Sequence, residues 1–247
     1  MNFFTSIFLG IVQGLTEFLP ISSSGHLVLA QKFISGYTTP GVLFEVILHA
    51  GTLVAVAFYF RKKLFSLKFE YLLLLLLGTL PAVIAGLLFS DFFEGLFKSY
   101  RFLGIGFIIS GILNLLTDRL PAKRKGLNKM DSLIIGVWQV VAIVPSISRS
   151  GSTIFGGVMR GVDRKEAAEF SFLLSIPAII GANIVEVAKY AGGSEVSDIS
   201  VYFVGFLAAM FTGYFSIKAV YFFLLSKNFK VFAYYCLVLG VVTLIFF

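Results

Sequence analysis

The sequence predicts an all-α polytopic membrane protein, with six transmembrane helices and two re-entrant helical hairpins in an inverted-topology repeat. Composition is the first reason: of 247 residues, 58% are hydrophobic and only 13% are charged, and the mean hydropathy is +0.94. A soluble globular domain carries about 25% charged residues. This chain therefore lacks the charge to cover a water-facing surface, which excludes soluble enzymes. Its net charge of +7 is attributed to loop Lys and Arg rather than to nucleic-acid binding.

Six stretches are long and apolar enough to be transmembrane helices, which need about 20 mostly apolar residues. Their ranges are 41–60, 71–90, 102–118, 166–188, 201–225 and 229–247. The single cysteine, Cys236, excludes an intramolecular disulfide. The N-terminal MNFFTSIFLG has no basic region and no cleavage site, so we expect no removable signal peptide.

Two further apolar stretches are too short to span, and each ends at a proline followed by a polar segment. The first, 3–18, is followed by LPISSSGH, and the second, 132–144, by PSISRSG. Irregular backbone survives at membrane depth only where it is buried in protein or lines a wet cavity. We therefore expect re-entrant hairpins over 1–36 and 130–160. Two ordinary spans with proline kinks are the alternative.

The two hairpins resemble each other at an offset of 126 residues, which aligns Gln13 with Gln139 and the polar segments with each other. The chain thus divides into a first repeat, 1–120, and a second repeat, 127–247, which together form one membrane domain. Each repeat contains one hairpin and three spans. Because three is odd, the second repeat is inverted relative to the first, as in many transporters.

Loop charge orients the predicted topology. Fourteen of the 20 Lys and Arg residues lie in loops that fall on one face. These loops are 61–69, 119–130, 160–165 and 226–230. The positive-inside rule makes this face cytoplasmic. Both termini then lie outside, and hairpin one enters the membrane from the outer face.

The first hairpin combines an acidic residue with hydroxyls and an imidazole. Gln13 and Glu17 are four residues apart and share a helix face. Glu17 at membrane depth indicates function, either as an oxygen ligand for Mg²⁺ or Ca²⁺ or in proton exchange. Ser22, Ser23 and Ser24 follow, with His26 close behind. Ser, His and Glu are the residue types of an activated nucleophile. The alternative is a polar hairpin tip whose side chains only hydrogen-bond to its own backbone.

The second hairpin contributes a cation. Arg149 lies between Ser148 and Ser150, and its five donors suit a phosphate or diphosphate. The next helix begins here, and its N-terminal N–H groups also attract anions. The alternative is a purely structural ion pair between Arg149 and Glu17. An acidic, nucleophilic tip facing a cationic tip favours hydrolysis of a phosphorylated lipid, while the repeat keeps a transporter or lipid flippase open.

Another polar pair lies on the first predicted span. Glu45 and His49 are four residues apart, so they share a helix face. The sequence leaves open whether they face the cavity or its outer mouth. For Glu169, in the matching span of the second repeat, packing is expected rather than catalysis.

Both tip motifs resemble the signature segments of the undecaprenyl-diphosphate phosphatase family, which is linked to bacitracin resistance. The motifs are QGLTEFLPISSSGH at 13–26 and PSISRSGSTI at 145–154, and the likeness extends to FEV at 44–46, LPAVIAGLLF at 80–89 and EFSFLLSIPA at 169–178. The resemblance implies removal of the terminal phosphate from undecaprenyl diphosphate. The product would be the monophosphate lipid carrier for cell-wall synthesis, made in the bacterial inner membrane. Because hairpin one enters from the outer face, the site is expected to open there.

The resemblance also implies roles for individual residues. Ser23 is the expected nucleophile with His26 as its acid/base partner, and the alternative makes His26 the nucleophile. Arg149 would bind the diphosphate together with serines from both tips. These serines are Ser22, Ser24, Ser148 and Ser150.

A divalent cation, Mg²⁺ or Ca²⁺, is the implied cofactor, with Glu17 and Gln13 as its ligands. The family has Glu or Gln at the position of Gln13, and the amide found here weakens that ligand role. Ser146 replaces a glycine of the family motif and is expected to stiffen its turn. The expected partners are a polyprenyl diphosphate lipid, membrane lipids and a second copy in a homodimer; nucleic acid is not among them.

Overall fold

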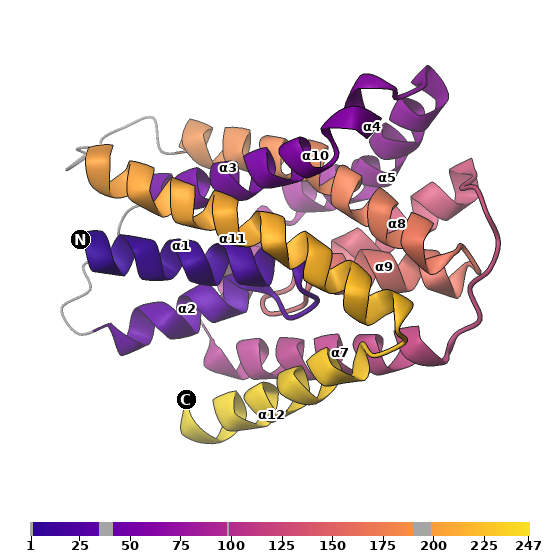
Figure 1. Ribbon diagram of the computed structural model, residues 1–247. Helices are drawn as coiled ribbons and strands as arrows, with labels where there is room; N and C mark the ends of the chain where they lie inside the picture. The colour runs from indigo at the N-terminus through magenta and orange to yellow at the C-terminus, as the bar shows by residue number, and fades with distance from the viewer. Residues whose placement is uncertain (1, 35–41, 98, 190–198) are drawn as a thin grey trace.

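The computed structural model describes residues 2–34, 42–97, 99–189 and 199–247, and these ranges fold into an all-helical bundle (Figure 1). Apart from helices, the described ranges contain one isolated bridge, between Arg124 and Val162. The helices are α1 (Phe3–Phe18), α2 (Ser23–Phe33), α3 (Val42–Tyr59), α4 (Arg61–Phe65), α5 (Phe69–Leu88), α6 (Ser90–Phe97), α7 (Tyr100–Arg119), α8 (Lys129–Val141), α9 (Arg149–Met159), α10 (Arg164–Lys189), α11 (Ile199–Leu225) and α12 (Lys230–Phe246). The all-α prediction is confirmed.

Four helices of the described chain are long and apolar enough to cross a membrane: α5, α7, α10 and α11. They coincide with four of the six predicted spans. The other two predicted spans form α3 and α12, which belong with α1 to the shorter apolar helices. The chain is thus a multi-pass membrane protein, and the total of six spans stays a prediction.

Each segment predicted as a hairpin contains two helices separated by a non-helical break, and its re-entrant course stays a prediction. Helix α1 ends at Phe18 because Leu19 is extended (ψ 143°), as the residue before a proline prefers. Helix α2 begins three residues after Pro20. Helix α8 begins with a capping box formed by Asn128 and Asp131, in which side chain and backbone satisfy each other's free N–H groups. We call residues 19–22, together with the flanking helix ends that carry Gln13, Glu17, Ser23 and Ser24, the first break. Residues 142–148, together with Arg149 and Ser150 at the start of α9, are the second break.

Both breaks contain a serine in the left-handed region of backbone conformation. Ser22 has φ 71° and Ser146 has φ 61°. This conformation costs a residue other than glycine roughly 1–3 kcal/mol and persists only where the surroundings enforce it. Ser146 occupies the position of the motif glycine, so the expected stiffening of this turn takes the form of a strained backbone. Such strain is concentrated at functional sites more often than elsewhere.

Helices of the first half pack against helices of the second half. Helix α1 packs against α11, and α8 packs against α5; likewise α3 contacts α11 while α10 contacts α5. The hairpins enter the bundle from opposite ends, and their breaks lie near its middle (Figure 1). This arrangement brings the polar segments of both hairpins into one region.

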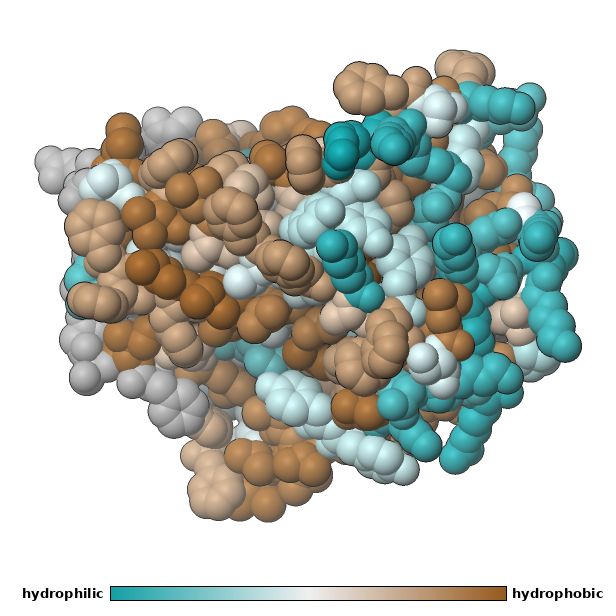
Figure 2. Space-filling model, viewed as in Figure 1, coloured by the Kyte–Doolittle hydropathy of each residue, from teal (hydrophilic) through white to brown (hydrophobic). Residues whose placement is uncertain are grey.

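Side-chain polarity divides the surface into two zones. In Figure 2, hydrophobic side chains cover the part of the bundle formed by α1 and α11, whereas hydrophilic side chains gather at the end where α4 and the α7–α8 connection lie. Large apolar side chains are exposed along α11, among them Phe211, Phe215 and Phe222. Exposed apolar surface of this extent is the surface a membrane protein presents to lipid.

Candidate active site

The two breaks touch each other at the centre of the bundle. The hydroxyl of Ser150 donates to the carbonyl oxygen of Leu19 at 3.2 Å. A Cβ atom on Gly25 would lie 2.3 Å from Ser146 Oγ, so only glycine allows α2 to approach the second break this closely. Contacts from both hairpins therefore hold the predicted site residues together.

A buried ion pair joins the two hairpins. Glu17 Oε1 lies 2.6 Å from Arg149 Nη2, and the side chains are only 6% and 17% exposed. Arg149 Nη1 also donates to the carbonyl oxygen of Ser171 at 3.5 Å. The structure thus contains the Glu–Arg pair that the sequence allowed as a structural alternative. Because an unpaired buried charge is strongly destabilising, this pair holds both tips in place.

Glu17 also binds the hydroxyl that the sequence singles out as a nucleophile. Ser23 Oγ donates to Glu17 Oε2 at 2.7 Å. Gln13 Nε2 donates to the same carboxylate oxygen at 3.0 Å. A serine hydroxyl hydrogen-bonded to a carboxylate has the geometry in which the carboxylate can accept the serine proton.

His26 makes its hydrogen bonds elsewhere. Its Nδ1 lies 2.6 Å from the carbonyl oxygen of Ser22, and its Nε2 lies 2.7 Å from Tyr235 Oη on α12. The ring also stacks on Tyr235 and meets the edge of Phe107. The predicted acid/base partner of Ser23 is therefore next to the site but engaged with α12, while Glu17 is the group bonded to Ser23.

The remaining predicted serines are hydrogen-bonded within the breaks. Ser148 is the N-cap of α9 and accepts from the Gly151 N–H at 3.1 Å. The Ser148 and Ser150 hydroxyls lie 3.1 Å apart, and those of Ser22 and Ser24 lie 3.2 Å apart. In the structure these hydroxyls stabilise the breaks, so diphosphate binding by them stays a prediction.

His49, whose location the sequence left open, faces the site. Its Nδ1 lies 2.9 Å from Gln13 Nε2 and 3.7 Å from Glu17 Oε2. The amide group has two hydrogens, so Gln13 can donate to Glu17 and His49 together. Glu45 instead accepts from Gln31 at 3.0 Å. Glu169 forms an ion pair with Lys63, a packing role.

Helix α7 contributes two polar residues that the sequence analysis did not identify. Ser110 Oγ donates to the Ser146 carbonyl oxygen at 2.9 Å and accepts from the Ser148 N–H at 2.8 Å. Asn114 Nδ2 donates to the Pro20 carbonyl oxygen at 2.7 Å. One helix thus satisfies backbone groups of both breaks, which buried irregular backbone requires. Each of the two is a single polar residue in an apolar span, so neither stands out in the sequence. Their four-residue spacing, which puts both on one helix face, was the only sign of a shared role.

The side chains around Glu17 do not fit a cation held by the protein. In the part of the chain that the structure describes, no three His, Cys, Asp or Glu side chains are grouped to hold a metal ion. Both oxygens of Glu17 accept hydrogen bonds, and Arg149 neutralises its charge. Gln13 turns its NH₂ group toward Glu17, and its Oε1 is buried without a partner. Mg²⁺ in proteins is usually bound through one or two carboxylates, with waters completing its shell, and here both oxygens of the one carboxylate are already engaged.

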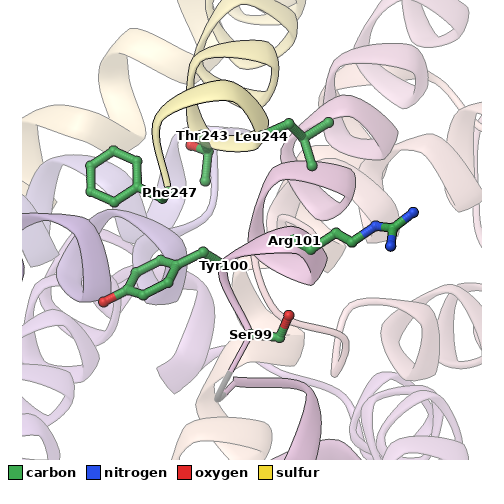
Figure 3. A pocket seen from close by; sticks show the side chains of 6 residues that line it. All are labelled: Ser99, Tyr100, Arg101, Thr243, Leu244 and Phe247. Carbon is green, nitrogen blue, oxygen red and sulfur yellow. The ribbon is translucent and has the colours of Figure 1, made fainter.

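A cavity of about 430 Å³ lies away from this centre, where α7 begins and α12 ends (Figure 3). It is lined by Ser99, Tyr100, Arg101, Thr243, Leu244 and Phe247. The predicted site residues lie elsewhere, at the breaks.

An all-helical membrane bundle with serine, carboxylate and guanidinium groups at two helix breaks defines a class of protein suited to phosphoryl transfer within the membrane. Residues 6–242 match the family model described as bacitracin resistance protein BacA, and the chain belongs to this family.

Curated relatives cover almost the entire chain. The chain is 44% identical to an undecaprenyl-diphosphatase of Carboxydothermus hydrogenoformans, over 99% of this chain and 97% of that protein. It is 43% identical to an undecaprenyl-diphosphatase of Halothermothrix orenii, over 99% and 98% of the respective chains. It is also 43% identical to undecaprenyl-diphosphatase 3 of Bacillus cereus, over 99% and 97%.

Proposed function

We propose that this chain is a membrane hydrolase that converts undecaprenyl diphosphate and water into undecaprenyl phosphate and inorganic phosphate. One observation carries the proposal: Ser23, Glu17 and Arg149 form a continuous hydrogen-bonded chain across the two breaks. Membership of the family and its undecaprenyl-diphosphatase relatives support the substrate. The activity recycles the lipid carrier for cell-wall synthesis and gives resistance to bacitracin.

In the proposed first step, Ser23 Oγ attacks the terminal phosphorus. A bond forms between Oγ and phosphorus, the bond from phosphorus to the bridging oxygen breaks, and undecaprenyl phosphate leaves with that oxygen. Glu17 Oε2, at 2.7 Å, accepts the proton of the hydroxyl. In the second step a water oxygen bonds to phosphorus as the bond from phosphorus to Ser23 Oγ breaks. Glu17 returns its proton to Oγ, which restores Ser23, and inorganic phosphate leaves with the oxygen and protons of the water.

Arg149 supports both steps by neutralising charge. Phosphoryl transfer depends mainly on positioning and on stabilising the charge of the equatorial oxygens. A guanidinium offers five donors in a fixed fork, so Arg149 can retain one hydrogen bond to Glu17 while it binds phosphate oxygens. Ser22, Ser24, Ser148 and Ser150 would add hydroxyl contacts to the diphosphate.

His26 is proposed as an acid/base group for the leaving group or the attacking water. Since Ser23 is bonded to Glu17, proton removal from Ser23 does not require His26. The assignment in which His26 itself is phosphorylated remains the alternative, and trapping the phosphoenzyme distinguishes the two.

For the cofactor, we propose that Mg²⁺ or Ca²⁺ is carried by the diphosphate of the substrate. Diphosphate oxygens are hard ligands that such cations prefer. This assignment agrees with the scarcity of carboxylates around Glu17, which does not favour a cation held by the protein alone.

For the topology, we propose six spans and two re-entrant hairpins in the bacterial inner membrane, with both termini and the active site at the outer face. The contacts α1–α11 and α8–α5, in which the first helix of each half packs against the same helix of the other half, support the inverted repeat. The hydrophilic end of the molecule (Figure 2), where the basic loops lie, supports a cytoplasmic position for that end. A homodimer also remains a proposal.

The test is release of phosphate from undecaprenyl diphosphate by the purified protein. We expect turnover by the wild type, its loss in EDTA and its return with added Mg²⁺ or Ca²⁺. A wild type that is inactive under every metal condition would contradict the proposed activity. Activity that EDTA leaves unchanged would contradict only the cofactor.

A further inference from the structure

Tyr235 contacts the active site from a helix distant in the sequence. Its hydroxyl lies 2.7 Å from His26 Nε2, across 209 residues of chain. The two rings are stacked, with centroids 5.6 Å apart and an interplanar angle of 10°. Phe107 meets the imidazole edge-on at 5.2 Å. The imidazole is therefore held by two aromatic rings and by hydrogen bonds at both nitrogens.

The partners of His26 define the direction of each hydrogen bond. The carbonyl oxygen of Ser22 can only accept, so Nδ1 is the donor at 2.6 Å. In a neutral imidazole the other nitrogen then carries a lone pair, and the Tyr235 hydroxyl donates to Nε2. The Ser22 carbonyl thus selects the neutral tautomer with the proton on Nδ1, and the Tyr235 hydroxyl holds the lone pair of Nε2 in a fixed direction.

Helix α12 is fixed against the first break next to this contact. Cys236 is fully buried, and its Sγ lies 3.8 Å from the Pro20 carbonyl oxygen. The same oxygen accepts the hydrogen bond from Asn114. Because the neighbouring residue is anchored at the break, α12 presents the Tyr235 hydroxyl to His26 at a defined position.

We propose that Tyr235 is a positioning residue for His26: its hydroxyl donates to Nε2 and its ring stacks on the imidazole, and together they fix the orientation of the ring beside the phosphoryl-transfer site. This inference rests on the proposed phosphatase function, in which His26 exchanges protons with the leaving group or water. Because Nδ1 is bonded to the Ser22 carbonyl, Nε2 is the nitrogen that can take up a proton, and the Tyr235 hydroxyl sets its position. Tyr235 acts through His26 and needs no contact with the substrate.

The chain offers a conservative variant and a matched control. Tyr235→Phe retains the stacked ring and removes only the hydroxyl. Tyr234→Phe makes the same change one residue earlier on α12, where the side chain is 60% exposed. Removal of one hydrogen bond that orients an acid/base group is expected to lower kcat about fivefold to tenfold in Tyr235→Phe, with KM unchanged. Tyr234→Phe should match the wild type.

The tautomer is measured directly by NMR of protein labelled with ¹⁵N-histidine, at about pH 8, where a free imidazole is neutral. The chain has only two histidines, and a His49→Gln variant assigns their signals. We expect His26 to carry its proton on Nδ1 in both proteins, because the Ser22 carbonyl remains. The ¹⁵N signal of the unprotonated Nε2 should move downfield in Tyr235→Phe, because this nitrogen loses its hydrogen bond.

Loss of kcat together with the shift of the Nε2 signal supports the proposal. Wild-type kcat in Tyr235→Phe overturns it, and so does a loss of kcat with an unchanged Nε2 signal, which would indicate a structural effect elsewhere. If the wild type hydrolyses no undecaprenyl diphosphate, the phosphatase assignment fails instead, and the NMR measurement still tests the contact between Tyr235 and His26.

Discussion

The two helix breaks have a similar form but different chemistry. Each follows an apolar helix, contains a proline and holds a serine at positive φ, Ser22 or Ser146. The first break places a carboxylate beside a serine, whereas the second presents a guanidinium at the start of a helix. A repeat can thus retain its backbone while its halves divide the acidic and cationic roles. The comparison teaches that neither hairpin contains the site alone.

The largest expected effect comes from removing either charge that joins the breaks. Glu17→Ala and Arg149→Ala should each lower kcat/KM by about 10³-fold or more, because transition-state charge or the base is lost. Each should also destabilise the fold by roughly 3–5 kcal/mol, since the partner is left as an unpaired buried charge. Phosphate release and thermal unfolding measure the two effects.

Arg149→Lys is the matched control for the second break, because it keeps the charge and removes the fork of donors. It should retain more activity than Arg149→Ala. Full activity in any of these variants would remove the affected residue from the mechanism.

A smaller effect is expected when the first break is made more acidic. Gln13→Glu replaces the amide that donates to Glu17 and His49 with a second carboxylate. At low Mg²⁺ the repulsion should lower activity about tenfold, and the new oxygen ligands should reduce the Mg²⁺ concentration that gives half-maximal rate. A metal titration of phosphate release measures both. An unchanged titration curve would show that Gln13 does not influence the cation.

Strain in the second break provides a test on stability. Ser146→Gly places the residue that tolerates positive φ where Ser146 has φ 61° and a buried hydroxyl without a partner. The free energy of unfolding should rise by about 1 kcal/mol or more, with turnover within about twofold of wild type because the Ser146 side chain is outside the proposed chemistry. Thermal unfolding in detergent measures the difference. A less stable variant would mean that the serine side chain itself stabilises the turn.

The smallest effect should come from an ion pair outside the breaks. Lys63 and Glu169 are 40% and 22% exposed, and exposed pairs contribute about 0–1 kcal/mol. Lys63→Ala should therefore leave phosphate release unchanged and lower the unfolding temperature only slightly. A loss of activity comparable to that of Arg149→Ala would show that activity does not depend more on the ion pair at the breaks than on other ion pairs.

Much of this organisation could be predicted from local sequence patterns. Apolar stretches predicted the long helices, and the dense polar segments after a proline predicted both breaks with Ser23 and Arg149. Glu17 was singled out as a charge at membrane depth, three residues before Pro20. Short helices α4 and α6 were not expected, because five and eight residues give too little periodicity to detect. The strained conformation of Ser22 was also missed, since a serine carries no signal for positive φ.

The contacts between helices distant in the chain could not be predicted from the sequence. Tyr235 is one of 10 tyrosines in a chain that also has 29 phenylalanines, and no neighbouring residue in the sequence distinguishes it from a lipid-facing aromatic residue. Ser110 and Asn114 support the breaks from another helix, which only the packing of α7 reveals. The hydrogen bond of His26 to α12 likewise depends on tertiary packing, and it changes the expected Ser–His pair into a Ser–Glu pair.

The central claim is that Ser23, held by Glu17 of the first break, attacks a phosphate bound by Arg149 of the second. The most direct measurement is trapping of the phosphoenzyme from undecaprenyl diphosphate labelled in its terminal phosphate, followed by peptide mapping. The account predicts label on Ser23 and none in Ser23→Ala. Label on His26, or turnover that persists in Ser23→Ala, would contradict it.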